Sequence, residues 1–208
     1  MYKRLSEEKL HELIDAGINE FAEKGYEKAN LSVIARHAGI SVGVIYKYYA
    51  DKEALFLACV RYSLEDLTTA LKEAAFRSDD FEESIRGVIH TLIIHAKEHP
   101  DINRMYHEIT AGSTKQFSKM LAEEVEGISA LVYTDIVRKA QEDGVCRKDA
   151  DPSLVAFFFD NLFMMLQFSY SCDYYRERLK LYCGEDIFDY DAKVEEELSK
   201  FLFSSLKA

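Results

Sequence analysis

The sequence predicts an all-α protein of about nine helices. Only two prolines and nine glycines interrupt its 208 residues, and no Val- and Thr-rich segment alternates apolar and polar residues as strands do. Instead, apolar residues recur with helical spacing over long stretches, and at 48% of the composition they are sufficient for a substantial core. We expect a helix-turn-helix domain over residues 1–51 and a second helical domain over 52–208, with a connecting helix over 52–72.

The first helix is predicted over residues 6–24. Its apolar residues recur at intervals of three and four, and Gly25 interrupts the pattern at the end. Lys3 and Arg4 precede it as a basic N-terminal arm, which either approaches a phosphate backbone or is an ordinary solvated terminus.

A second helix begins near Leu31. Leu31, Ile34 and Ala38 lie on one face of it and form a small apolar stripe directed toward a core. Asn30 is a residue type that caps helix N-termini well. Gly39 follows the stripe, and glycine readily takes the left-handed conformation that ends a helix. A short helix followed by a sharp turn is therefore expected here.

A third helix is predicted to begin after Ser41, which serves as its N-cap. The unpaired amides of its first turn, from Val42, Gly43 and Val44, should face outward, where an anion could bind. The run 46–48, Tyr-Lys-Tyr, supplies phenols and an ammonium suited to phosphate oxygens. The second and third helices, joined by the tight turn at Gly39, together predict a helix-turn-helix.

A helical corner with a glycine turn also occurs in proteins that never touch DNA. Here the corner is followed by Asp51, which should cap a further helix whose first residue is Lys52. Several short segments support a more specific interpretation, and they are Gly25-Tyr26, Asn30-Leu31, Ile34-Ala35, Ala38-Gly39-Ile40-Ser41, Gly43, Ile45-Tyr46, Tyr48-Tyr49 and Lys52-Glu53.

These segments resemble the N-terminal domain of the TetR-like transcriptional regulators, over about the first quarter of the chain. The resemblance implies a homodimeric DNA-binding regulator, most often a repressor, released from a palindromic double-stranded DNA operator by a small apolar or amphipathic effector. The residues that would contact DNA are Asn30, Ser32, Arg36, Ser41, Val42, Gly43, Val44, Tyr46, Lys47, Tyr48 and Lys52.

Four positions depart from the family pattern. Ala29 stands where the family usually has a hydroxyl residue, so Asn30 must supply the cap. Val42 and Val44 replace polar or small residues, which favours contact with thymine methyl groups over bidentate hydrogen bonds. Tyr49 occupies a position where Phe is commonest.

The net charge of −11 is distributed unevenly. Residues 1–56 contain eight basic and nine acidic residues, so −10 of the net charge belongs to the remainder. Within 31–52, three basic residues outnumber one acidic residue, which suits a DNA-facing surface. No apolar run is long enough to span a membrane without interruption and the cysteines lack zinc-like spacing, so we expect a cytoplasmic protein without membrane, metal or cofactor.

The second domain is predicted to hold five helices, separated by polar or glycine-containing breaks. They are expected over 81–97, 101–111, 117–142, 154–174 and 191–206. The helix over 154–174 is the most apolar, and its aromatic residues surround almost the whole circumference. Because one core contact cannot bury them all, some should face a second subunit or a ligand.

A pocket and an interface are both expected in this domain, although the same residues would also make an ordinary core. The predicted pocket residues are Tyr106, Phe117, Asp160, Met164, Met165 and Phe168. The predicted dimer-interface residues are Phe163, Val194, Leu198, Phe201 and Leu202.

No pattern indicates an enzyme. We find no nucleophile paired with a base and no phosphate-binding glycine loop, and His95 with His99 is better read as two solvent-facing histidines than as a metal pair. The competing interpretation is a helical small-molecule-binding or protein-interaction module without DNA readout.

Overall fold

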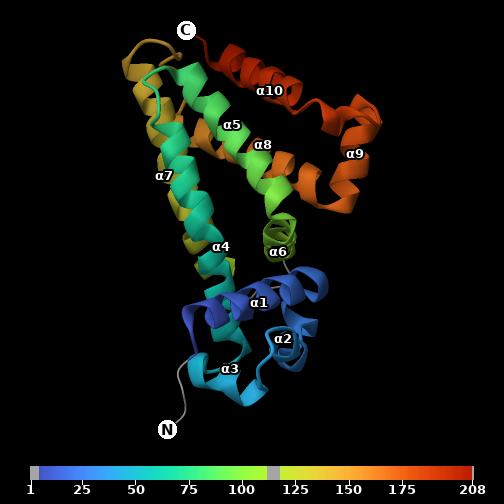
Figure 1. Cartoon of the computed structure of the whole chain (residues 1–208). Helices are drawn as coiled ribbons and strands as arrows, with labels where there is room; N and C mark the ends of the chain where they lie inside the picture. The colour runs from blue at the N-terminus through green and yellow to red at the C-terminus, as the bar shows by residue number, and fades with distance from the viewer. Residues whose placement is uncertain (1–4, 112–117, 208) are drawn as a thin grey trace.

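The computed structural model describes residues 5–111 and 118–207, and over these residues the chain is helical without strands (Figure 1). The all-α prediction is confirmed. The helices are α1 (Glu7–Lys28), α2 (Leu31–His37), α3 (Val42–Tyr48), α4 (Lys52–Ala75), α5 (Phe81–Glu98), α6 (Pro100–Thr110), α7 (Ser118–Glu142), α8 (Pro152–Ser171), α9 (Asp173–Cys183) and α10 (Asp191–Leu206), with a 3-10 turn, η2, at Ile187–Asp189.

The head of the molecule consists of α1, α2, α3 and the first half of α4, at the bottom of Figure 1. Its core is built around the fully buried side chains Phe21, Ile34, Ile45 and Leu55. The apolar stripe expected in the second helix is therefore what joins α2 to the rest of the head.

The first helix is longer than the sequence pattern predicts. It runs to Lys28 because the chain resumes helical geometry after Gly25, whose backbone has φ 67° and ψ 165°. Glycine tolerates this left-handed φ without a steric cost, so a kink replaces the expected end. Met105 of α6 is buried in the same core as α1, which links the head to the body above it.

The body contains a second core formed by α5, α7, α8 and α10. The end of α4 joins this core through Leu71 and Ala75, whereas its beginning joins the head through Leu55. One continuous helix of 24 residues is thus shared between two cores. The division into 1–51 and 52–208 with a connector stays a proposal, and this sharing of α4 supports it.

One helix was not predicted as a separate element. The apolar helix expected to reach residue 174 ends at Ser171, where Cys172 takes an extended conformation, and α9 follows directly. Helix α9 has no buried residue, so it has no apolar stripe that sequence periodicity could reveal. Within the described residues there are consequently ten α-helices and not nine.

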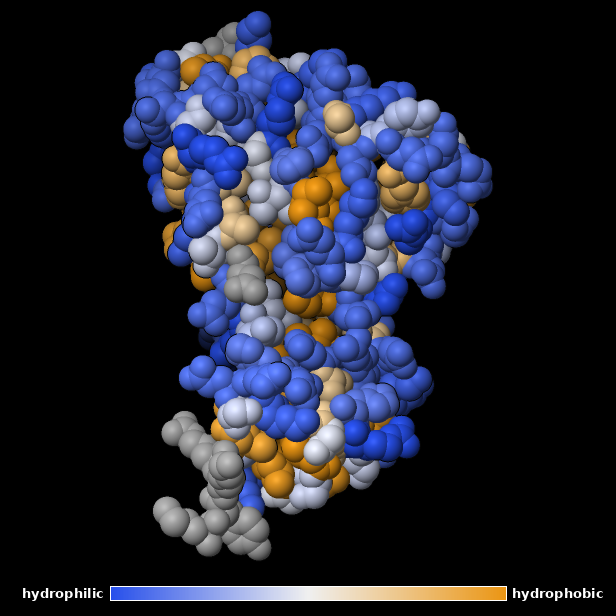
Figure 2. All heavy atoms as spheres, viewed as in Figure 1, coloured by the Kyte–Doolittle hydropathy of each residue, from blue (hydrophilic) through white to orange (hydrophobic). Residues whose placement is uncertain are grey.

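Helix α8 is long and apolar enough to cross a membrane, judged by length and composition within the described residues. Half of its most apolar stretch is buried inside the body, which is the pattern of a core helix. Hydrophilic side chains cover most of the face of the body in Figure 2, with apolar side chains visible between them.

Candidate nucleic-acid interface and internal pocket

The turn between α2 and α3 has the geometry that the sequence predicts. Gly39 has φ 62°, and its N–H donates to the carbonyl of Arg36 at 3.1 Å. The N–H of Ile40 donates to the carbonyl of Ala35 at 2.9 Å. At the other end of α2, the Asn30 side-chain oxygen accepts from the Ser32 N–H at 2.8 Å. Local hydrogen bonding therefore fixes the direction in which α3 leaves the corner.

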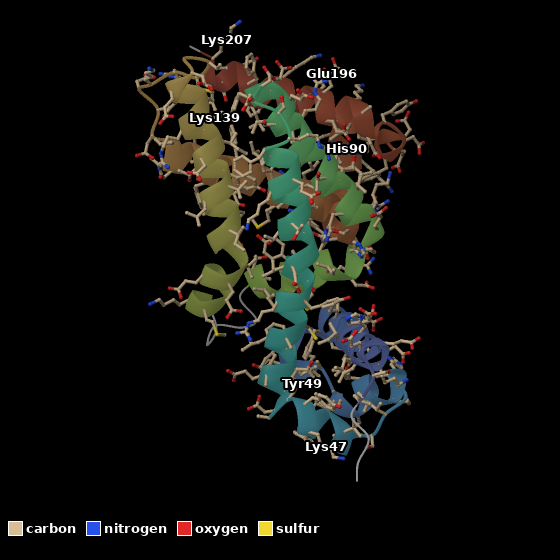
Figure 3. The ribbon with its side chains drawn as sticks, turned by 60° about the vertical axis from the view of Figure 1, so that its left-hand side comes forward. Lys47, Tyr49, His90, Lys139, Glu196 and Lys207 are labelled. Carbon is tan, nitrogen blue, oxygen red and sulfur yellow. The ribbon has the colours of Figure 1, made fainter. Side chains whose placement is uncertain are left out.

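Helix α3 presents its polar residues at the far end of the head. Lys47 is exposed and points away from the body in Figure 3, and Tyr46 beside it is also exposed. Ser41 begins the helix in an extended conformation, and its side chain makes no capping hydrogen bond. Ser32 and Arg36 of α2 are exposed as well. These groups are the donors that a phosphate backbone would meet.

Val42 and Val44 are less exposed than the pattern predicts. Both are half-buried, and Val42 packs against the core of the head. Only part of each side chain is available for contact with a base. Gly43 between them is exposed, and it carries no side chain that could separate the backbone from a ligand.

Tyr48 has a structural partner within the head. Its hydroxyl accepts a hydrogen bond from the Leu5 N–H at 2.6 Å, which holds the segment before α1 against α3. The phenolic proton of Tyr48 remains a possible donor to phosphate. The predicted basic arm, Lys3 and Arg4, lies outside the described residues.

Lys52 at the start of α4 lies against the junction between α1 and α2. Its Nζ donates to the carbonyl oxygens of Glu27 at 3.0 Å and Ala29 at 3.4 Å, and it lies 4.8 Å from the centre of the Tyr26 ring. These contacts use a cation to join α4 to the end of α1. The contact of Lys52 with phosphate that the sequence predicts is untested, and these contacts favour a structural role for the cation.

The body contains a pocket between α4, α6, α7 and α8, with an empty volume of about 780 Å³ continuous with solvent. Its walls are mainly aliphatic, as in many small-molecule sites. Of the residues predicted for a pocket, Tyr106 and Asp160 line it. Glu126, Tyr133 and Gln167 also line it and were not predicted.

Three further predicted pocket residues, Met164, Met165 and Phe168, lie elsewhere, and this part of the prediction is corrected. Phe168 is buried against the rings of Tyr106 and His107, and Met165 lines a separate groove formed with α9 and α10. Met164 is half-buried and does not line the pocket. Phe117 lies outside the described residues. The apolar composition of α8 could not show which of its faces turns toward the pocket.

The unpredicted pocket residues do carry a sequence signal. Glu126, Ser129 and Tyr133 are spaced by three and four residues, so they form a polar stripe on one face of α7. The stripe of a carboxylate, a hydroxyl and a phenol was the informative pattern in this helix.

The two carboxyl groups of the pocket lie in surroundings that disfavour ionisation. The Tyr106 hydroxyl donates to Glu126 Oε1 at 2.7 Å, and burial raises the pKa of Glu126. Burial, assisted by the nearby charge of Glu126, raises the pKa of Asp160 to about 7. Burial also raises the pKa of Tyr133, and both carboxylates add to this effect. The pocket is therefore an acidic site inside an apolar lining.

A second apolar feature lies on the outside of the body. Phe157 and Phe158 of α8 are 60% and 58% exposed, and Phe201 of α10 is 62% exposed. Phe158, Phe201 and Leu162 line one groove between the two helices. We refer to Leu154, Phe157, Phe158, Leu162 and Phe201 as the aromatic face. An apolar surface of this kind normally marks an interaction site.

The predicted interface residues are only partly on this face. Phe201 lies on the aromatic face. Phe163 and Leu202 are each only 1% exposed and pack inside the protomer, so their assignment to the interface is corrected. Val194 and Leu198 are half-buried against the core of the body. Exposed Phe157 and Phe158 take the place of buried Phe163.

Comparisons with known proteins agree with the geometry of the head and the body. Residues 13–59 match the family model for bacterial regulatory proteins, tetR family. The uncharacterized HTH-type transcriptional regulator YhgD of Bacillus subtilis (strain 168) is 23% identical over 76% of this chain and 82% of that protein. The chain spans only 37% and 27% of the length of two further curated relatives.

Two solved structures share the fold over nearly the whole chain. The fatty acid degradation regulator FadR from Bacillus halodurans has a TM-score of 0.70 at 18% identity and covers 93% of this chain and 95% of its own. The ketosteroid transcriptional regulator KstR2 of Mycobacterium tuberculosis has a TM-score of 0.69 at 19% identity, and the match covers 99% of this chain and 97% of that one.

A helix-turn-helix head on an all-helical body, together with these relatives, defines a DNA-binding transcriptional regulator. Within that class the chain is TetR-like, as the head residues had implied.

Proposed function

We propose that this regulator is a homodimeric, cytoplasmic repressor that leaves a palindromic operator when a small molecule enters the pocket. The observation that carries this proposal is that the pocket shares its walls with the head. Helix α4 contributes Val60 both to the pocket and to the core of the head, and α6 contributes Met105 to both. A ligand that displaces either helix must also displace the head.

The dimer is supported by the aromatic face. Pairing α8 and α10 with the same helices of a second copy would remove Phe157, Phe158 and Phe201 from water. Two heads related by a two-fold axis then require half-sites about 34 Å apart, or one helical turn of DNA.

The proposal is tested by selecting operators from random duplexes and then measuring binding to the selected operator by fluorescence anisotropy. We expect a nearly palindromic consensus and a dimer on each duplex. In a reporter strain, deletion of the gene should raise expression from that operator. If no duplex is selected above non-specific binding, the competing interpretation as a module without DNA readout is favoured.

Gly43→Ala should have opposite effects on folding stability and on operator affinity. A Cβ at Gly43 would meet only the Ser41 Oγ, at 3.8 Å, so the methyl group fits. Alanine in a helix is favoured over glycine by about 0.5–1 kcal/mol, so the variant should be slightly more stable to denaturant. Because the methyl group would stand where the bare backbone meets DNA, we expect operator affinity to fall about tenfold, or ~1.4 kcal/mol. A variant that is more stable and binds normally would exclude a close approach at this position.

The two lysines of the head should behave differently in a salt titration. Lys47→Ala should reduce the slope of log affinity against log salt by about 1, because it removes one phosphate contact. Lys52→Ala should leave that slope unchanged and lower the free energy of unfolding by about 1–2 kcal/mol, because it removes contacts with the Glu27 and Ala29 carbonyls. Equal slope changes for both variants would show that Lys52 contacts phosphate as first predicted.

A further inference from the structure

We propose that the pocket between α4, α6, α7 and α8 accepts a protonated amine with an apolar body, held by Glu126, Asp160 and Gln167. This inference rests on the proposed effector function and gives that effector a chemical class. It is carried by the charge and the hydrogen-bonding balance of the lining residues.

The charged residues in the described lining of the pocket are all acidic. Its described lining includes Glu126 from α7 and Asp160 from α8, and it includes no lysine, arginine or histidine. Neither carboxyl group has an ion-pair partner among the described residues. A buried carboxylate needs a compensating positive charge or must hold its proton. A bound cation would supply that charge, whereas a carboxylate ligand would add a further negative one.

Hydrogen-bond donors on the lining are largely directed at protein acceptors. The Ser63 hydroxyl donates to the Cys59 carbonyl at 2.8 Å, and the Ser129 hydroxyl donates to the Glu126 carbonyl at 3.1 Å. The Tyr106 hydroxyl donates to the Glu126 carboxylate. What remains for a ligand is mainly a set of acceptors, together with the hydroxyls of Thr68 and Tyr133.

Gln167 supplies the clearest unused acceptor. Its side chain is only 6% exposed and lines the pocket, and its Oε1 has no hydrogen-bond partner within the described structure. The amide nitrogen is identified by its contact with the Phe163 carbonyl at 3.5 Å, because an oxygen in its place would face another oxygen. A buried acceptor without a donor is costly. An ammonium group, with several N–H donors on one centre, can satisfy Gln167 and both carboxylates together.

The other walls suit the apolar part of such a ligand. Leu64, Leu67 and Ile109 line the pocket beside the rings of Tyr106 and Tyr133. Aromatic rings attract cations through their faces, and the aliphatic side chains remove an alkyl or aryl body from water.

The test compares four probes of equal chain length in calorimetric titrations of the full dimer at pH 8: n-decylamine, decyltrimethylammonium, 1-decanol and decanoate. We expect n-decylamine to bind at least about tenfold more tightly than decanol or decanoate. The affinity of decyltrimethylammonium should lie between that of n-decylamine and those of decanol and decanoate, because it keeps the charge but cannot donate a hydrogen bond to Gln167.

Variants assign the effect to the named carboxyl groups. Glu126→Gln and Asp160→Asn should each weaken n-decylamine at least about tenfold and leave decanol nearly unchanged, which also shows that the pocket is folded. Glu123→Gln, an exposed position on the same helix, is the matched control and should change nothing.

A second measurement does not depend on variants. Decyltrimethylammonium is charged at every pH, so any change of its affinity with pH reports only the ionisation of groups on the protein. Its affinity should rise between pH 6 and pH 8 as Asp160, whose pKa is about 7, loses its proton. Glu126, Tyr106 and Tyr133 are the other titratable groups that line the pocket.

Decanol or decanoate binding as tightly as n-decylamine would overturn the inference, and so would no binding of any probe. These outcomes leave the proposed function standing if another ligand releases the operator. Preferential binding of n-decylamine without any change in operator affinity would support the ligand class and contradict the effector role.

Discussion

Phe201→Glu is expected to convert the dimer into a monomer and to reduce affinity for a two-half-site operator by at least about a hundredfold. The reason is that the second head of a dimer binds at a high effective concentration, which contributes a factor of about 10² to 10⁴. A glutamate on the aromatic face would have to be buried next to apolar side chains from a second copy, and burying a charge in this way is costly. Sedimentation and anisotropy on the same samples measure both quantities.

The control is Phe76→Glu. Phe76 is 58% exposed, similar to Phe201, but it follows α4 and lies outside the aromatic face. This variant should remain a dimer and bind normally. A dimeric Phe201→Glu with unchanged operator affinity would place the interface on another surface.

Asp160→Asn is expected to stabilise the protein, increasingly so as the pH rises. Burial in the folded protein raises the pKa of Asp160 to about 7, whereas in an unfolded chain this carboxyl group would have its ordinary pKa of 3.8. Between these values the unfolded chain has lost the proton and the folded protein retains it, so the stability of the unmodified protein falls with rising pH. Above about pH 7 the cost is complete, because both states are then ionised.

Asparagine does not titrate and avoids this cost. We expect the stability difference between variant and unmodified protein to grow by about 1–3 kcal/mol from pH 5 to pH 8, allowing for partial solvent access. Chemical denaturation at both pH values measures it, with Asp135→Asn on the exposed side of α7 as the control. A difference that is constant with pH would show that Asp160 titrates near its ordinary value. Stabilisation together with weaker amine binding would mark Asp160 as a residue retained for function.

The head was predictable because its determinants are local. Asn30 caps the helix that begins at the next residue by accepting from the N–H two residues ahead, and Gly39 needs only its own backbone freedom to make the turn. Both effects act within a few residues, so the sequence contains them in full. The hydrogen bond of Lys52 is not local, because its acceptor, the Glu27 carbonyl, is 25 residues away in the sequence. No sequence pattern identifies that acceptor.

The body was predictable as helices but not as surfaces. Helix α8 is apolar around its circumference, so spacing alone could not distinguish buried Phe163 from exposed Phe157. Periodicity identifies a face only where polar residues mark the opposite one, and that is also why exposed α9 was missed. The pocket residues of α7 were accessible in principle, because Glu126 and Tyr133 form a polar stripe within an otherwise apolar pattern.

The sharing of α4 between two cores makes the helix a rigid arm. Its 24 residues extend about 36 Å at 1.5 Å per residue, with the pocket alongside its middle. A rotation of about 5° around the end held in the body would carry the other end through about 3 Å, by the same geometry. In a symmetric dimer both arms move, so the spacing of the two α3 helices could change by about twice that amount against a fixed groove repeat of about 34 Å. A ligand would not need to unfold or reorganise the body, because the length of the helix amplifies a small displacement into a mismatch with DNA.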